Sequence, residues 1–296
     1  MTPKSRAEGI LFGITFIWGT TFALGKVVLL EVTPLQMISF RFTLATIIIL
    51  AFSYRSIFPL SLRQALRGGL LGLFLFAGFV VQTIGLTITT ASKSAFITGM
   101  VVVFAPLLQI VMTRRPPKIG NIIGVAIVTL GLWFLTSPEG SAFNAGDGLT
   151  LACAILFAMY IVYLDIVSHE MTAVQLTFLQ FVTNALLSIG AMSIFESAQL
   201  RLSTFGTLGL LYLAIFATVL TTFLQTRYQK ETSPTRTAVI FTMEPVFAAI
   251  IAAIFLGERL GAIGIVGGAL IIGGILVSEL SDAIPLLNRT AGTSDS

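Results

Sequence analysis

Two ionisable side chains, Arg41 and Glu244, interrupt long apolar runs of this 296-residue chain. Measured along a helix, Arg41 lies roughly 10 Å from one end of its run and Glu244 roughly 14 Å from one end of its own. Charge at such depth in a membrane is costly and usually faces a cavity or a partner, and the two residues could pair with each other. Glu244 suits a proton, cation or solute site, because burial favours a neutral carboxyl group, or a structural role beside the helix breaker Pro245. Arg41 has a structural alternative too, as a fixed ion pair or a side chain that snorkels to the interface.

Other residues offer little chemistry. The sole histidine, His169, stands beside Glu170 in an expected loop, and one histidine cannot form an H-E-x-x-H zinc site. No carboxylate pair lies within an apolar run, and no G-x-x-x-x-G-K-[ST] loop occurs. The lone Cys153 excludes an internal disulfide and is expected to be inert packing. We therefore expect no metal, no cofactor and no enzyme activity. No basic cluster with interleaved aromatics suggests nucleic acid.

The composition is that of a membrane protein. Hydrophobic residues make up 56% of the chain and charged residues 10%, with a mean hydropathy of +0.98, whereas soluble domains carry about 25% charged residues. Ten apolar runs are long enough to cross a bilayer as helices, and they lack the alternation of barrel strands. The runs are 9–25, 32–54, 68–92, 94–113, 119–138, 148–164, 171–195, 202–226, 237–257 and 260–278. The predicted fold class is an all-α membrane protein.

The charges between the runs predict the orientation. If the N-terminus is cytoplasmic and ten helices cross, twelve lysines and arginines fall on the cytoplasmic side and four outside. The outer four are Lys26, Lys93, Arg201 and Arg259. Basic residues concentrate in cytoplasmic loops, so we expect both termini to be cytoplasmic.

The chain also matches itself. Residues 7–42 align with 146–181 at an offset of 139, and the alignment continues from Gln82 onward at an offset of 143. Matched polar pairs include Glu8 with Asp147, Lys93 with Arg236, and Gln82-Thr83 with Gln225-Thr226. The predicted units are a first repeat at 1–140, a second repeat at 141–281 and a disordered cytoplasmic tail at 282–296. Because each repeat holds five helices, the two enter the membrane from opposite sides, and inverted repeats favour alternating access around a midplane site.

The repeat brings further candidate residues to comparable depth. Trp18 aligns with Phe157, Arg41 with Gln180, and Val101 with Glu244. These positions would surround a pseudo-twofold axis if they face inward, with Asn184 one turn beyond Gln180. An aromatic pair with few polar groups describes a small-molecule pocket, although such aromatics are also common packing residues. Gln82 and Gln225 lie nearer helix ends, where they suit gates or interhelical hydrogen bonds.

The chain resembles the EamA-type branch of the drug/metabolite transporter superfamily over about residues 8–280. The resemblance rests on Trp18-Gly19-Thr20-Thr21-Phe22, Phe40-Arg41-Phe42, Ala91-Ser92-Lys93-Ser94-Ala95-Phe96, Pro106, Met243-Glu244-Pro245-Val246-Phe247 and Leu256-Gly257-Glu258-Arg259-Leu260. It implies ten helices in two inverted repeats, a central cavity with peripheral fifth and tenth helices, and export of amino acids, metabolites or drugs. The halves differ at the pocket, where Trp18-Gly19 becomes Phe157-Ala158.

The leading hypothesis is thus a secondary transporter, with export of small metabolites such as amino acids or drug-like solutes, and with protons as a candidate coupling ion. The alternatives are a lipid-handling or sensor protein and, with less support, an intramembrane enzyme. Partners are a small-molecule substrate and the lipid bilayer, and the expected location is a bacterial inner membrane. Glycines with small-xxx-small spacing in the fifth and tenth runs favour packing within a monomer over a homodimer seam.

Overall fold

A computed structural model describes residues 3–136, 143–196, 202–255 and 262–280. The expected tail at 282–296 and the motif at 256–260 lie outside the described residues. Within the described residues the chain is helical and contains no strand. The helices are α1 (Pro3–Val28), α2 (Pro34–Ile57), α3 (Leu62–Ile88), α4 (Ala91–Gly99), α5 (Val101–Thr113), α6 (Ile119–Thr136), α7 (Ala145–Ser168), α8 (Ala173–Phe195), α9 (Thr204–Ala214), α10 (Thr221–Tyr228), α11 (Pro234–Phe241), α12 (Met243–Phe255) and α13 (Ala262–Leu280). A π-helical segment, Ile215–Leu220, joins α9 to α10, and a 3-10 turn, Gln229–Glu231, follows α10.

Eight apolar helical segments in the described part of the chain are long enough to cross a membrane. They match the first four and the sixth to ninth runs of the sequence. Three of them are composite: α4 with α5, α9 with α10, and α11 with α12. The fifth and tenth runs contain the shorter apolar helices Ile119–Phe134 and Ile265–Ser278. The chain is therefore an all-α protein with many membrane-spanning segments.

Side-chain caps fix where several helices begin. Thr33 and Thr172, which are equivalent in the two repeats, each form a capping box, with Gln36 and with Gln175 respectively. Such reciprocal bonds satisfy backbone N–H groups that a helix start leaves without partners. A cap also corrects one predicted boundary: the run 68–92 does not form one helix, because Thr90 accepts a hydrogen bond from the N–H of Lys93 and so begins α4.

Two membrane-spanning segments are broken near the middle. One breaks at Met100, between α4 and α5, and the other at Thr242, between α11 and α12. The second break has a clear cause: the ring of Pro245 clashes with the carbonyl of the residue four positions earlier, and α11 ends at that residue, Phe241. Gly99, a weak helix former, precedes the first break. The breaks fall within one residue of equivalent positions in the sequence repeat.

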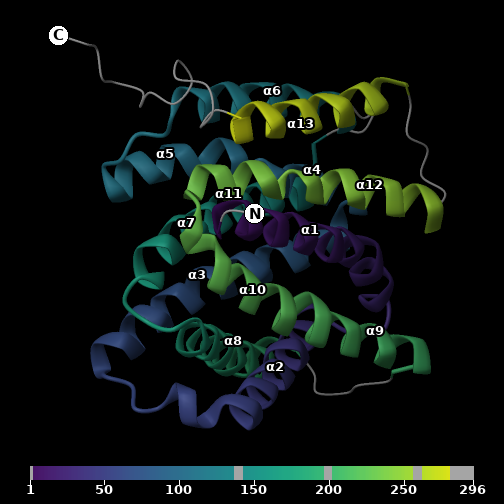
Figure 1. Cartoon of the computed structure of the whole chain (residues 1–296). Helices are drawn as coiled ribbons and strands as arrows, with labels where there is room; N and C mark the ends of the chain where they lie inside the picture. Colours follow the sequence, from purple (N-terminus) through teal and green to yellow (C-terminus); the bar gives the residue numbers. More distant parts are fainter. Residues whose placement is uncertain (1–2, 137–142, 197–201, 256–261, 281–296) are drawn as a thin grey trace.

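The helices are arranged in layers (Figure 1). Helices α6 and α13 lie side by side along one face of the bundle, and α2 and α8 lie together at the opposite face. Between them, α1 packs against α12, and α7 packs against both α3 and α5. The α6–α13 contact is antiparallel, since a Cβ at Gly124 would lie 2.8 Å from the carbonyl of Gly274 and one at Gly131 would lie 2.8 Å from that of Gly267.

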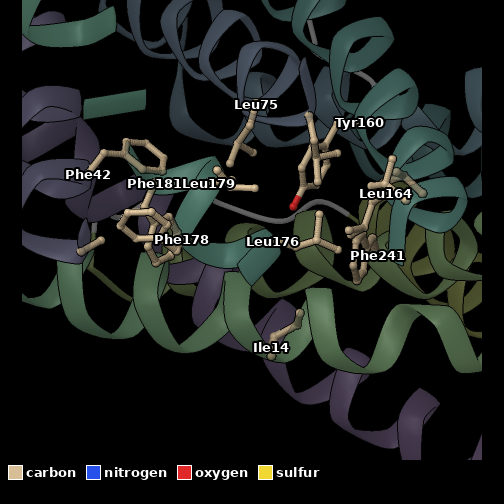
Figure 2. Close-up of a cluster of buried hydrophobic side chains, with 14 of the residues drawn as sticks. Ile14, Phe42, Leu75, Tyr160, Leu164, Leu176, Phe178, Leu179, Phe181 and Phe241 are labelled. Carbon is tan, nitrogen blue, oxygen red and sulfur yellow. The ribbon is translucent and has the colours of Figure 1, made fainter. Parts of the chain in front are cut away.

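A large hydrophobic cluster joins side chains from several helices (Figure 2). It includes Phe42 from α2, Tyr160 from α7, Phe181 from α8 and Phe241 from α11. The rings of Phe42 and Phe181 have centroids 6.0 Å apart. Helices from both halves of the chain therefore contribute to one shared core.

Candidate functional site

A cavity lies between helices of the two halves, beside the breaks in both broken segments, within about 720 Å³ of empty space that is partly open to the surroundings. Its lining is mainly apolar, with a small number of polar groups, as is usual for sites that bind small molecules. The lining residues are Trp18, Thr21, Arg41, Leu75, Phe79, Gln82, Thr98, Gly99, Val101, Phe157, Tyr160, Ile161, Thr222, Gln225, Phe241 and Glu244.

Trp18 is held in the cavity wall by two contacts. Its indole Nε1 donates a hydrogen bond to the Thr221 hydroxyl at 3.0 Å, and its ring meets that of Phe241 edge-on at 5.0 Å. The next residue, Gly19, sets how closely α1 approaches α12, because a Cβ there would lie 2.6 Å from Cβ of Phe247 and 3.2 Å from the carbonyl of Glu244. The Trp18-Gly19 pair therefore places an aromatic ring in the cavity and brings the start of α12 beside it.

Phe157 occupies the equivalent position in the second half. Its ring lies against Gly78, where a Cβ would be 2.4 Å from Cε1 of the phenylalanine. It also meets Phe79 edge-on, with centroids 5.5 Å apart. The missing side chain at Gly78 thus makes room for Phe157 in the cavity wall.

Arg41 lies deep in α2 and is 4% exposed. Its Nε donates to the Thr218 hydroxyl at 3.1 Å, and its Cζ lies 4.8 Å from the centroid of the Phe79 ring. Thr218 belongs to the π-helical segment and donates to the carbonyl of Leu213 at 2.8 Å. Among the described residues, no carboxylate forms an ion pair with Arg41. The guanidinium is oriented by a hydroxyl and an aromatic face, and its charge has no protein counter-ion there.

Glu244 lines the same cavity in the first turn of α12, directly after the break at Thr242. The partly exposed N–H groups of a helix start favour negative charge at this position. In the described part of the chain, neither a hydrogen bond nor an ion pair engages its carboxyl group. Arg41 and Glu244 therefore face the same cavity as two separate polar groups. They do not form the direct pair that the sequence left open.

Gln82 and Gln225 also line the cavity. Gln82 donates to the Thr98 hydroxyl at 3.2 Å, which joins α3 to α4. Gln225 donates to the side chain of Gln229 at 3.0 Å within the same segment. The two glutamines therefore combine a wall position with hydrogen bonds to protein groups.

Gln180 and Asn184 lie behind the wall and do not line the cavity. Gln180 accepts a bond from the Tyr160 hydroxyl at 2.6 Å and donates to Thr226 at 3.2 Å. Asn184 donates to the carbonyl of Gly72 at 3.0 Å. Both are fully buried. Their contact with the site is indirect, through Tyr160, which does line the cavity.

A second, smaller cavity adjoins the first. The two share Thr21, Arg41, Phe79 and Gln82, and the second continues to Gly25 near the end of α1 and Leu86 near the end of α3. Arg41 therefore stands where the central cavity meets a narrower passage toward that end of the bundle.

Several lining residues were missed by sequence reasoning, among them Phe79, Tyr160, Thr222 and Phe241. All four are aromatic or hydroxyl residues on helices whose inward face was not known. One signal was present for Thr222 and Phe79, since extending the repeat offset of 143 to the helical turn before Gln82 aligns them with each other. Within the described residues, no group of three or more His, Cys, Asp or Glu side chains could hold a metal ion.

The apolar segments and the cavity between them define a helical membrane protein with a central small-molecule site. A profile of the EamA-like transporter family matches the chain twice, over residues 6–137 and 144–280. An "Uncharacterized transporter" of Archaeoglobus fulgidus is 30% identical over 267 residues, covering 90% of this chain and 83% of that protein. The "Uncharacterized transporter YetK" of Bacillus subtilis is 24% identical over 286 residues, covering 91% and 85%.

The chain belongs to the EamA-like transporter family, within the drug/metabolite transporter superfamily, and is a membrane transporter. The resemblance seen in the sequence is thereby confirmed. A solved structure, described as "Crystal structure of protein", matches with a TM-score of 0.78 at 17% identity, covering 94% of this chain and 97% of that one. At that identity the match shows a shared fold.

Proposed function

We propose that the protein is a secondary transporter that binds a small amphipathic solute between two inverted five-helix repeats and exposes it alternately to each side of the membrane. The observation that carries the proposal is the central cavity, where Arg41 and Glu244 face the same space and neither forms an ion pair among the described residues. Buried charges without partners are unfavourable, so their retention is best explained by a solute or ion that engages them.

Ten membrane crossings follow if α6 and α13 cross as well as the eight longer segments. Helix α6 has 18 residues and α13 has 19, each within the length that can span a bilayer. Each packs along the other. We propose that this pair forms a peripheral layer beside the cavity-bearing helices.

The inverted repeat is supported by contacts between equivalent residues. Gly124 is equivalent to Gly267, and Gly131 to Gly274. Replacing each glycine by its equivalent therefore converts the contact of Gly124 with Gly274 into that of Gly131 with Gly267. In both contacts a Cβ on the first glycine would lie 2.8 Å from the carbonyl of the second. A two-fold axis between antiparallel helices produces this reciprocity, and for helices that cross the bilayer such an axis lies in the membrane plane.

The α2–α8 contact also joins equivalent residues of two antiparallel helices. Phe42 and Phe181 are equivalent and meet each other directly. The start of α8 lies near the end of α2, since Gln175 donates to the carbonyl of Ile57 at 3.2 Å. The other end of α8 lies near the start of α2, where Glu196 accepts from the N–H of Leu35 at 3.2 Å. Together with the two separate family matches, this supports repeat units at 1–140 and 141–281.

The cavity suggests the class of solute. Arg41 supplies a fixed cation, Glu244 a carboxyl group, and Trp18, Phe157 and Phe241 an aromatic wall. A guanidinium forms strong charge-assisted bonds with carboxylates, and aromatic faces bind apolar bodies and cations. We propose a small solute with an anionic group, an apolar body and a second polar group, as in amino acids and many drug-like molecules.

Glu244 is the proposed coupling residue. A carboxyl group without a protein partner, within a membrane-embedded cavity, can exchange a proton as the cavity changes its exposure. We further propose export across a bacterial inner membrane, with both termini cytoplasmic, in keeping with the distribution of basic residues.

Transport by purified protein in proteoliposomes tests the proposal. Labelled amino acids, nucleosides and cationic drugs would be measured with and without an imposed proton gradient. Glu244→Gln should abolish gradient-driven accumulation and spare downhill exchange, whereas Glu231→Gln, in the exposed Arg227–Glu231 pair, should leave both unchanged. Unaltered proton dependence in Glu244→Gln would exclude the coupling role. No response to any small solute would favour a lipid-handling or sensor protein.

A further inference from the structure

Two ion pairs in different parts of the bundle are formed by equivalent residues of the two repeats. Near the start of α1, Glu8 forms an ion pair with Arg236, in the first turn of α11. At the start of α7, Asp147 forms an ion pair with Lys93 of α4, with Nζ and Oδ2 2.5 Å apart. Glu8 is equivalent to Asp147, and Lys93 to Arg236. Each pair therefore joins the acid of one repeat to the base of the other.

A threonine completes each pair. The Thr232 hydroxyl donates to Oε1 of Glu8 at 3.2 Å, and the Thr89 hydroxyl donates to Oδ1 of Asp147 at 2.6 Å. These threonines are equivalent at the offset of 143. Arg236 also donates from Nη2 to Oε2 of Glu8 at 3.2 Å, so its guanidinium engages both carboxylate oxygens. Three residues thus recur with the same contacts, which the matched sequence pairs alone did not predict.

The two triads lie at opposite ends of the cavity-bearing helices. The Glu8–Arg236–Thr232 triad lies at the start of α1 and of α11, and the Asp147–Lys93–Thr89 triad lies at the start of α7 and of α4. With cytoplasmic termini, the first is the inner triad and the second the outer triad. The acid of each triad is buried: Glu8 is 6% exposed and Asp147 is 0% exposed.

We infer that the two triads act as latches, each of which holds one end of the central cavity closed. Opening either end would then separate the acid–base pair at that end, which joins the two repeats. This inference rests on the proposed alternating access. Buried ion pairs contribute little net stability compared with apolar packing, but losing one partner is strongly unfavourable. Such a pair is suited to a contact that must be made and broken as a unit. Its location between repeats puts it across the surface that rocking would move.

The latches are not equal. Lys26, at the end of α1, donates to the carbonyls of Leu86 at 2.7 Å and Thr89 at 2.6 Å. It therefore adds a third helix to the outer latch. The equivalent residue in the second repeat is Asp165, whose carboxylate cannot donate to carbonyls in the same way. Within the described residues, the inner latch has no lysine in this role.

Thiol accessibility tests the latches without a known substrate. Thr21 lines both cavities, and replacing the single native cysteine by Cys153→Ala allows Thr21→Cys to be the sole thiol. A charged, membrane-impermeant methanethiosulfonate would be added to one face of oriented vesicles. Asp147→Asn should speed labelling from the outer face by about tenfold, and Glu8→Gln from the inner face by a similar factor. Lys26→Gln should raise outer labelling alone.

Charge exchange and a surface control separate latching from general loosening. The double variants Glu8→Arg/Arg236→Glu and Asp147→Lys/Lys93→Asp should return labelling toward the parent rate. Glu231→Gln, which breaks an exposed pair, should change neither face. Equal increases from both faces in each single variant, or no change in any, would overturn the latches. If counterflow persists in that case, the protein transports its solute without the latches. Labelling from the same single face in every variant would contradict alternating access itself.

Discussion

Trp18 donates its indole N–H to the Thr221 hydroxyl at 3.0 Å, while the equivalent residues of the other half, Phe157 and Gly78, pack together without a hydrogen bond. The same contact between helices is thus polar on one side of the cavity and apolar on the other. Arg41 lies on the polar side, bonded to Thr218 one turn before Thr221. The two repeats share a backbone plan, but their side chains make a one-sided site.

The first prediction concerns Gly78. Gly78→Ala should lower the free energy of unfolding by about 1–3 kcal/mol, because the new Cβ would displace the Phe157 ring. Thermal unfolding in detergent measures this. Gly190→Ala is the matched control, since nothing lies within 4 Å of that Cβ position. Equal melting temperatures for the two variants would show that the Phe157 position is not set by Gly78.

The second prediction concerns solute affinity. The chain has two tryptophans, and Trp133 is largely exposed, so Trp133→Phe leaves Trp18 as the reporter within the cavity. A solute that changes Trp18 emission should bind about 10- to 100-fold more weakly in Arg41→Gln, because a hydrogen bond to a charged group contributes about 1.5–3 kcal/mol. Thr218→Val should weaken binding less, since it removes only the group that orients Arg41. Unchanged affinity in Arg41→Gln would show that Arg41 does not contribute to solute binding.

The third prediction is a pH dependence at the expected outer surface. Hydrogen bonds from the hydroxyl and the N–H of Ser203 hold the pKa of Glu31 below its ordinary value. Because the folded pKa is depressed, the stabilisation is complete above the ordinary value of about 4.3 and is lost as pH falls through the lower folded pKa. The melting temperature of the parent should therefore drop below about pH 4.3.

Glu31→Gln provides the comparison, because it removes the titrating group and keeps the shape. Its melting temperature should fall less steeply over the same acid range. Glu170, the equivalent residue, has its pKa lowered by the hydrogen bond from Arg67 and should contribute a similar acid loss that Glu170→Gln reduces. Parallel curves for the parent and both variants would contradict these contacts.

The helical class and the positions of the apolar runs followed from the sequence because the bilayer imposes length and composition on every crossing. The breaks at Met100 and Thr242 did not, although Pro245 marked one of them. The lengths of equivalent segments did indicate one inserted residue. The segment from Ser203 to Gln225 is one residue longer than its equivalent from Ser61 to Gln82. The π-helical turn at 215–220 lies within that longer segment and accommodates the extra residue.

Site residues were predicted less evenly, because a repeat gives depth in the membrane but not the face of the helix. Depth alone placed Trp18, Arg41, Phe157 and Glu244 together, and all four line the cavity. The same argument put Gln180 beside them, but its side chain bonds to Tyr160 behind the wall. The two latches required knowledge of contacts between halves, which a repeat within one sequence does not contain.

Counterflow in proteoliposomes tests the central claim most directly. Vesicles loaded with an unlabelled solute from a panel of L-phenylalanine, L-leucine, adenosine and tetraphenylphosphonium would be diluted into trace label. The account predicts transient accumulation of at least one label by the parent protein, with loss of accumulation in Arg41→Gln and no loss in Glu231→Gln. Accumulation that is equal in parent and Arg41→Gln vesicles, or no greater than in protein-free vesicles for every solute, would contradict a transporter that works through this cavity.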